Sequence, residues 1–188
     1  GFTPGLSAGE WAVGVGIEYL DWKEDTNRTL DVLETGPLLA ASLRYLQSLE
    51  SGLLLGYRGK LWGGRVKYEG SEMRNPDNPV SGTTGYSGIS NEGQIRWRKT
   101  GDDNRLDTVF GMGFDYWRRS LSYIQDEDWY VAYLRLGMES GVNDPGNWSV
   151  ALGVKYPVWV RENAHLNEIG FDSNPPLEPG RQLSLYAD

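Results

Sequence analysis

The stretch Trp11–Tyr19, with the sequence WAVGVGIEY, decides how this chain folds. Its odd positions carry large apolar or aromatic residues, and its even positions carry Ala12, Gly14, Gly16 and Glu18. Successive side chains of a β-strand point to opposite faces of a sheet. This strict alternation therefore predicts a strand with one apolar face and one face of small or charged residues.

The same alternation returns along the rest of the chain. It is clearest in residues 148–156, where large apolar residues alternate with Ser149, Ala151, Gly153 and Lys155. The other segments that show it are 37–45, 53–61, 91–98, 108–116, 130–139 and 183–188. Segment 91–98 is the weakest, because Asn91 and Gly93 interrupt its apolar face. No segment has a sustained helical period, so the sequence predicts an all-β chain of eight strands in a single domain, residues 1–188.

Length and composition exclude several classes of protein. A chain of 188 residues suits one domain with its own core. The absence of cysteine excludes disulfides, thiolate metal sites and a cysteine nucleophile. The net charge of −8 argues against a nucleic-acid-binding surface. No apolar run reaches the roughly 18 residues that a transmembrane helix needs. Residues 1–5 lack the segments of a signal peptide, so an exported form would already be processed.

The predicted connections alternate in length. Short ones fall at 47–52, 100–105 and 140–147, and longer ones at 23–36, 69–90, 118–128 and 162–180. An up-and-down barrel with this alternation has all its long loops at one end, as membrane barrels do. The longest predicted loop, 69–90, contains the turn-forming sequence NPDNP at 75–79 and is expected to be the main contact surface.

Small residues on the minority face of the strands indicate which face is the interior. Glycine and alanine recur there, for example at Gly14, Gly111, Gly113 and Ala151. A water-facing strand normally carries Thr, Lys, Glu or Gln instead, whereas small residues suit the cramped interior of an eight-stranded barrel. The predicted fold is thus a single up-and-down antiparallel transmembrane β-barrel of eight strands, with its apolar face outward.

Charged residues of both signs share the predicted interior with these small residues. Buried charges must be paired, and the inventory allows pairing. Arg58, Lys60, Arg96 and Arg98 are expected to pair with carboxylates such as Glu18, Asp115 and Glu139; in an open pore the same cluster would select anions. The predicted lumen charge network comprises Glu18, Arg44, Arg58, Lys60, Arg96, Arg98, Asp115, Arg135, Glu139 and Lys155.

Aromatic residues with a polar edge are unusually common, with 8 Trp and 11 Tyr against 4 Phe. Such rings favour the boundary between hydrocarbon and water. Trp11 and Tyr19 are eight positions apart on one face, as are Trp148 and Tyr156, which is roughly 26 Å along a strand and suits a tilted crossing of an outer membrane. The predicted aromatic girdle comprises Trp11, Tyr19, Tyr45, Tyr57, Trp97, Tyr116, Tyr130, Trp148 and Tyr156.

From about Glu10 to Asp188, the architecture resembles the small eight-stranded outer-membrane barrels of Gram-negative bacteria, the OmpA and OmpX type. The resemblance implies export to the outer membrane, with outer-membrane lipid, lipopolysaccharide and other envelope proteins as partners. Barrels of this type usually end in Phe or Trp, whereas this chain ends in Leu185-Tyr186-Ala187-Asp188. Either the eighth strand is truncated at its C-terminal end, or the closure of the barrel differs from that family.

Few residues suggest chemistry. The single histidine, His165, has Glu162, Glu168 and Ser173 nearby in sequence, and a Ser-His-acid site of a lipid-modifying barrel enzyme is conceivable there. A solvated loop histidine is the simpler interpretation. The acidic residues Asp21, Glu24, Asp25 and 126–128 suggest either a divalent cation that bridges lipopolysaccharide phosphates or a solvated acidic rim, and their spacing, which matches no calcium loop, favours the rim. We expect no catalytic residue, no metal and no cofactor.

Four functions are consistent with this sequence. The favoured one is a non-enzymatic outer-membrane barrel that acts as an envelope scaffold or recognises partners through its loops. The alternatives are a narrow channel for small solutes or anions, a soluble ligand-binding barrel of the lipocalin type and a lipid-modifying enzyme that uses His165. A lipocalin-like barrel would require the Val and Leu face to line a cavity.

Overall fold

The computed structural model describes residues 9–24, 32–49, 52–71, 78–98, 106–121, 125–140 and 150–187. Each strand is antiparallel to its neighbours, and all belong to one sheet in the order β1 to β8. The strands are β1 (Glu10–Glu24), β2 (Val32–Ser48), β3 (Leu53–Ser71), β4 (Pro79–Arg98), β5 (Leu106–Ser120), β6 (Asp126–Ser140), β7 (Val150–Asn163) and β8 (Ser184–Ala187). A 3-10 turn, η2 (Leu166–Ile169), precedes β8. The prediction of an all-β, eight-stranded, up-and-down fold is confirmed.

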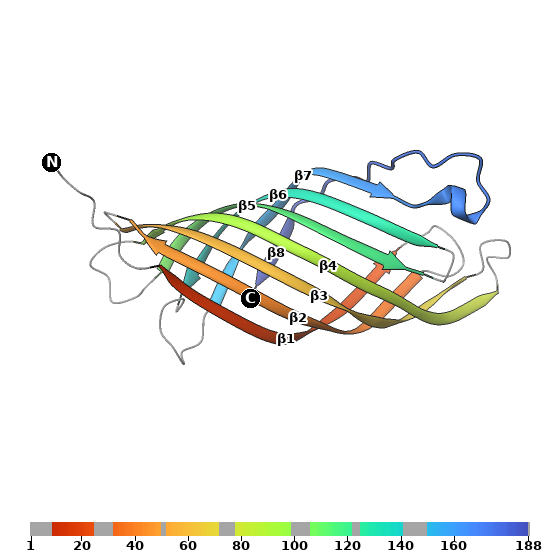
Figure 1. The fold of residues 1–188 in the computed structure, drawn as a ribbon, viewed down its shortest axis with the longest axis horizontal. Helices are drawn as coiled ribbons and strands as arrows, with labels where there is room; N and C mark the ends of the chain where they lie inside the picture. Colours follow the sequence, from red (N-terminus) through yellow and green to blue (C-terminus); the bar gives the residue numbers. More distant parts are fainter. Residues whose placement is uncertain are drawn as a thin grey trace.

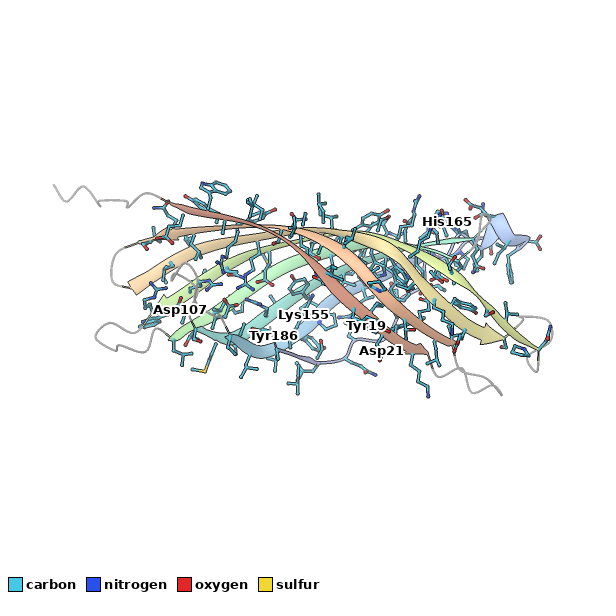
Figure 2. All side chains as sticks on the ribbon, turned by 90° about the horizontal axis from the view of Figure 1, so that it is seen from below. Tyr19, Asp21, Asp107, Lys155, His165 and Tyr186 are labelled. Atoms are coloured by element: carbon cyan, nitrogen blue, oxygen red, sulfur yellow. The ribbon has the colours of Figure 1, made fainter. Side chains whose placement is uncertain are left out.

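The sheet is curled into an elongated, barrel-like cylinder (Figure 1). Asp107 lies near one end and His165 at the other, so these ends are called the Asp107 end and the His165 end (Figure 2). Among the described residues, no helix has the length and hydropathy of a membrane-spanning helix.

The apolar face of the strands points outward, as predicted. On β1 the five residues Trp11, Val13, Val15, Ile17 and Tyr19 are 66–92% exposed. The opposite holds inside, where Arg96 is fully buried and Glu139 is 1% exposed. The sequence pattern and the burial pattern therefore agree that this barrel is apolar outside and charged inside.

Close approach explains the small residues of the interior. A Cβ atom on Gly113 would overlap the ring of Tyr133, which reaches across from β6. A Cβ on Gly153 would overlap the backbone of Leu136 and Gly137. These two glycines make room for neighbouring strands and rings, which supports the argument that Gly and Ala mark the cramped side.

The predicted difference between long and short loops is wrong for most of the barrel. The strands continue into the segments expected to be long loops, because β3 extends to Ser71 and β4 begins at Pro79. Most of the predicted 69–90 loop is therefore a hairpin of paired strands; Asn78 is described, whereas residues 72–77 lie outside the described residues. The segment predicted to be the weakest strand belongs to β4, which at 20 residues is the longest. Within the described residues, the long connection is the one between β7 and β8.

The described pairing of β8 is short. Ala187 pairs with Leu152, near the start of β7. Pairing is missing at the beginning of β8, because the ladder with β7 starts only at Ser184. Residues 174–180, NPPLEPG, contain three prolines, which have no N–H for a sheet ladder. Only Leu177 makes a bridge there, to Glu162 of β7.

Candidate functional site: a plugged lumen with a central cavity

A network of buried charges fills the lumen toward the Asp107 end. Glu139 accepts hydrogen bonds from three arginines: Arg58 at 2.6 Å, and Arg96 and Arg135 at 2.5 Å each. Arg96 also donates two hydrogen bonds to Gln94, at 2.8 and 2.9 Å. We call this group, together with Asp107, the Glu139 cluster. Its charge-assisted bonds offset the cost of burying several ions and block this end of the lumen.

A second cluster blocks the lumen toward the His165 end. Arg119 contacts Glu34 at 3.0 Å and Glu127 at 2.9 Å. Glu34 is fully buried and accepts hydrogen bonds from Thr84, at 2.6 Å, and from Tyr86. The guanidinium of Arg119 also lies 4.6 Å from the ring centroid of Trp22, a cation–π contact. We call this group the Arg119 cluster.

Sequence reasoning missed the Arg119 cluster. It assigned Glu34 to the predicted loop 23–36, and Arg119 and Glu127 to the loop 118–128. In the structure all three lie in strands, at inward-facing positions. The signal that would have found them is the continued alternation of inward positions beyond the apolar segments, as in Trp117 and Arg119 on β5.

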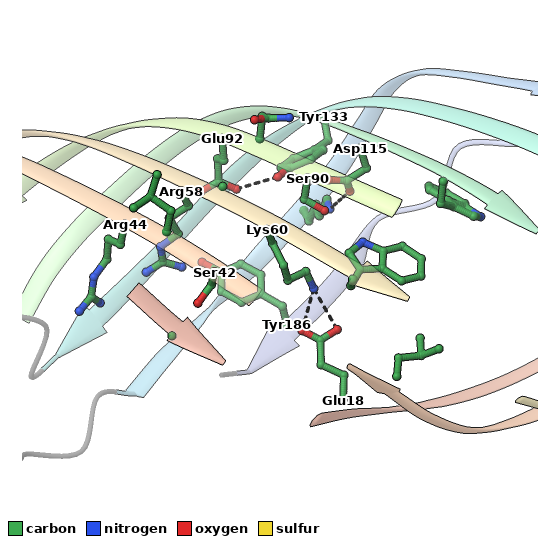
Figure 3. A pocket seen from close by; sticks show the side chains of 18 of the residues that line it. Glu18, Ser42, Arg44, Arg58, Lys60, Ser90, Glu92, Asp115, Tyr133 and Tyr186 are labelled. Atoms are coloured by element: carbon green, nitrogen blue, oxygen red, sulfur yellow. Dashed lines mark hydrogen bonds and ion pairs between the residues drawn. The ribbon is translucent and has the colours of Figure 1, made fainter. Parts of the chain in front are cut away.

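A cavity of about 960 Å³ lies between the two clusters (Figure 3). Two ion pairs face into it: Lys60 contacts Glu18 at 2.8 Å, and Lys155 contacts Asp115 at 2.7 Å. These pairs are more hydrated than the Glu139 cluster, since the Lys60 and Glu18 side chains are 34% and 45% exposed. The aromatic residues that line the cavity include Trp22, Trp62, Tyr86, Trp117, Trp129, Tyr133 and Tyr186. This combination of rings and half-hydrated charges gives a mixed polar and apolar site.

Cations also stack on the aromatic walls of this cavity. The ammonium of Lys155 lies 3.5 Å from the ring centroid of Tyr133, and the guanidinium of Arg135 lies 4.8 Å from that of Tyr186. The Tyr133 hydroxyl donates to Glu92 at 3.0 Å. Rings and charges are thus held together, which fixes the walls of the cavity.

The residues of the predicted lumen charge network fall into three places. Arg58, Arg96, Arg135 and Glu139 meet in the Glu139 cluster, and Arg98 contacts Asp107 at 2.8 Å beside it. Glu18, Lys60, Asp115 and Lys155 form the two central ion pairs. Arg44 lines the cavity. Sequence reasoning also placed Glu92 and Gln94 on the inward face, but it missed Asp107, which is buried beside Arg96 and Arg98.

The described members of the predicted girdle lie on the outer surface, and four of them form two ring pairs. Toward the Asp107 end, Trp11 packs on Tyr45 with ring centroids 4.4 Å apart. Toward the other end, Tyr116 packs on Tyr130 with centroids 5.1 Å apart. The remaining described members, Tyr19, Tyr57, Trp97 and Tyr156, are all exposed. Trp148 lies outside the described residues.

His165 anchors the long connection between β7 and β8 at its end of the barrel. Its Nε2 lies 2.8 Å from Asp128 and its Nδ1 lies 3.4 Å from Glu168. Asp128 also accepts hydrogen bonds from Arg118, at 2.9 Å, and Tyr116, at 2.8 Å. The ring nitrogens thus face carboxylates rather than Ser173, so the arrangement is not the Ser-His-acid geometry that nucleophilic catalysis needs.

The acidic segment 126–128 faces arginines. Asp126 and Asp128 lie near Arg118, and Glu127 lies near Arg119. Asp21 is exposed, the side chain of Glu24 is not described, and Asp25 lies outside the described residues. No group of three potential metal ligands occurs within the parts of the chain that the structure describes.

The site is therefore a lumen closed by two charge clusters, with a central cavity and an outer surface that is apolar. No protein family, curated protein or solved structure matches this chain.

Proposed function

We propose that this protein is an integral β-barrel of a bacterial outer membrane, without enzymatic activity, that acts as an envelope scaffold or surface-recognition protein. One observation carries the proposal: apolar side chains of β1 are up to 92% exposed while arginine and glutamate fill the interior. Soluble proteins rarely leave a continuous apolar surface this large in water. Surrounding hydrocarbon would turn the same surface into a favourable contact.

The outer aromatic residues support this placement. Trp11 and Tyr19 on β1 mark two levels about 26 Å apart along the strand, and the intervening exposed residues are Val13, Val15 and Ile17. An apolar band between two aromatic levels is what a barrel needs at the two membrane interfaces. Lipid and lipopolysaccharide are the proposed partners of this surface, and other envelope proteins are proposed partners of the barrel ends.

The two charge clusters favour a scaffold over a channel. A conducting lumen would need an open path past Glu139 and Arg96, and past Arg119 and Glu34, where side chains are in contact. A soluble lipocalin-like barrel is less compatible still, because its apolar face would line the cavity instead of covering the outside.

Refolding tests this proposal. The urea-unfolded chain should refold in detergent micelles and not in buffer alone, with a mobility difference between unboiled and boiled samples on a gel. Val15→Arg places a charge in the middle of the apolar band and should cost about 2–4 kcal/mol of stability in micelles or bilayers. The control Asp21→Arg lies beyond Tyr19 and should cost less than about 1 kcal/mol. A stable monomer in buffer whose stability is unaffected by Val15→Arg would refute the membrane proposal.

A further inference from the structure

The cylinder is open along one seam. β8 pairs only with β7, over Leu152–Lys155, and within the described residues the free edge of β1 has no strand partner. The central cavity is lined by residues of both strands that border the seam, Gly14 on β1 and Tyr186 on β8. The cavity therefore lies directly behind the seam.

Two polar atoms in the cavity wall have unused hydrogen-bonding capacity. Among the described residues, Asp115 Oδ1 and the Tyr186 hydroxyl are buried without a hydrogen-bond partner. The other oxygen of Asp115 is held by Lys155 at 2.7 Å. A buried acceptor without a donor is costly, so a ligand that brings an O–H or N–H to Asp115 gains a bond that the protein alone leaves unmade.

The charges around the cavity select against an ionic ligand. Lys60 is already paired with Glu18, and Lys155 with Asp115. The arginines Arg58, Arg119 and Arg135 of the cavity wall are also paired, with Glu139, Glu34 and Glu92. An anionic head would meet these carboxylates, and a cationic head would meet the paired lysines and arginines. An uncharged head group with hydroxyl or amide donors meets neither repulsion and still satisfies Asp115.

The seam suits an apolar tail. Val13 on β1 and Leu185 on β8 are each 83% exposed on the outer surface. Aromatic rings such as Trp62 and Tyr186 line the cavity itself. A chain that leaves the lumen through the seam would thus pass from aromatic walls to the apolar outer face.

We propose that the cavity binds a single-chain amphiphile with an uncharged, hydrogen-bond-donating head. The head lies in the lumen with Asp115 as an acceptor, and the chain leaves through the seam between β1 and β8. This inference rests on the proposed membrane location, because the chain ends in hydrocarbon. A volume of about 960 Å³ is within the range of ligand pockets.

Two substitutions test the site without disturbing the fold. Gly16 lies between Gly14 and Glu18 on β1, and a Cβ placed on it has no atom within 4 Å. Gly16→Trp should therefore fill the cavity beside the seam. Gly93 also has no atom within 4 Å of an added Cβ but belongs to the outward face of β4, so Gly93→Trp is the matched control. Tyr186→Phe removes the unpartnered hydroxyl and keeps the ring.

The experiment titrates the refolded full chain in micelles with glycerol monolaurate and counts bound molecules by native mass spectrometry. We expect one bound molecule, about fivefold weaker binding for Tyr186→Phe, loss for Gly16→Trp and no change for Gly93→Trp. Laurate and dodecyltrimethylammonium should bind at least tenfold more weakly.

Three outcomes would refute the proposed binding site. These are equal binding by the Gly16→Trp variant, no binding at all, or tighter binding of either ionic amphiphile. Each leaves the membrane proposal intact if the chain still refolds only in micelles. If the chain instead folds stably in buffer, the membrane proposal fails, and the same titration in buffer then tests the cavity by itself.

Discussion

Arg96 and Glu139 form a fully buried ion pair in the lumen, with Arg96 Nη2 and Glu139 Oε2 2.5 Å apart and exposures of 0% and 1%. Glu139 also holds Arg58 and Arg135, so one carboxylate balances much of the positive charge at the Asp107 end. The mutual dependence of these groups leads to the first prediction.

Replacing Glu139 should strongly destabilise the barrel. Glu139→Gln leaves three arginines beside a neutral group, and removing one partner of a buried pair typically costs about 3–5 kcal/mol. The matched control is Glu18→Gln, which breaks a partly exposed pair with Lys60 and should cost less than about 1 kcal/mol. Urea unfolding in micelles, followed by tryptophan fluorescence, measures both. Equal losses for the two variants would contradict the assignment of Glu139 as the centre of the cluster.

The hydroxyl of Thr84 should contribute measurably to the stability of the barrel. It is fully buried and donates to Glu34 at 2.6 Å, so Thr84→Val keeps the shape and removes one bond to a buried carboxylate. The expected loss is about 1.5–3 kcal/mol of unfolding free energy. Thr83→Val, at the neighbouring exposed position, should change stability by less than about 0.5 kcal/mol. The prediction is wrong if the two variants unfold at the same urea concentration.

Replacing His165 should loosen the connection between β7 and β8 without changing the stability of the barrel. His165→Ala removes the contacts with Asp128 and Glu168 that anchor the segment before β8. We expect faster proteolysis within residues 166–183 and an unchanged urea midpoint, because local opening needs less free energy than global unfolding. Ser173→Ala is the control, because it changes a residue of the same segment that is not part of the anchor. This variant should leave the rate of proteolysis unchanged. Equal cleavage rates for His165→Ala and the wild-type chain would show that His165 is not the anchor.

Gly113 should not tolerate a methyl group. Gly113→Ala would press on Tyr133 and on the backbone of Asn91, and such overpacking costs about 1–3 kcal/mol. Gly93→Ala has free space around the new Cβ and should be neutral or slightly stabilising. Thermal unfolding in micelles compares the two. Equal melting temperatures would mean that the close packing around Gly113 relaxes easily.

The sequence was sufficient to predict eight strands and their inward and outward faces, because the alternation of Trp11–Tyr19 recurs along the chain and assigns the residues of each segment to one face or the other. It was insufficient toward the His165 end. There the outward residues of the strands are polar, as with Lys67 and Glu69 on β3, so no apolar face remains to alternate with the interior. That is why Glu34, Arg119 and Glu127 were assigned to loops.

The central cavity was beyond sequence reasoning for a different reason. Its opening depends on where β8 begins to pair, which the three prolines of residues 174–180 explain only after the pairing is known. Its unused hydrogen-bonding groups, Asp115 Oδ1 and the Tyr186 hydroxyl, depend on side-chain positions brought together from β5 and β8. The alternating pattern of a single strand does not predict which side chains from different strands lie close together.

The short pairing of β8 also bears on how the protein reaches its native state. Closing a complete cylinder requires the first and last strands to find one another across the whole chain, and the entropy cost of that step grows with the length between them. In the part of the chain described, every backbone ladder joins strands that are neighbours in sequence. Assembly can therefore advance one hairpin at a time, without a final search between the two ends.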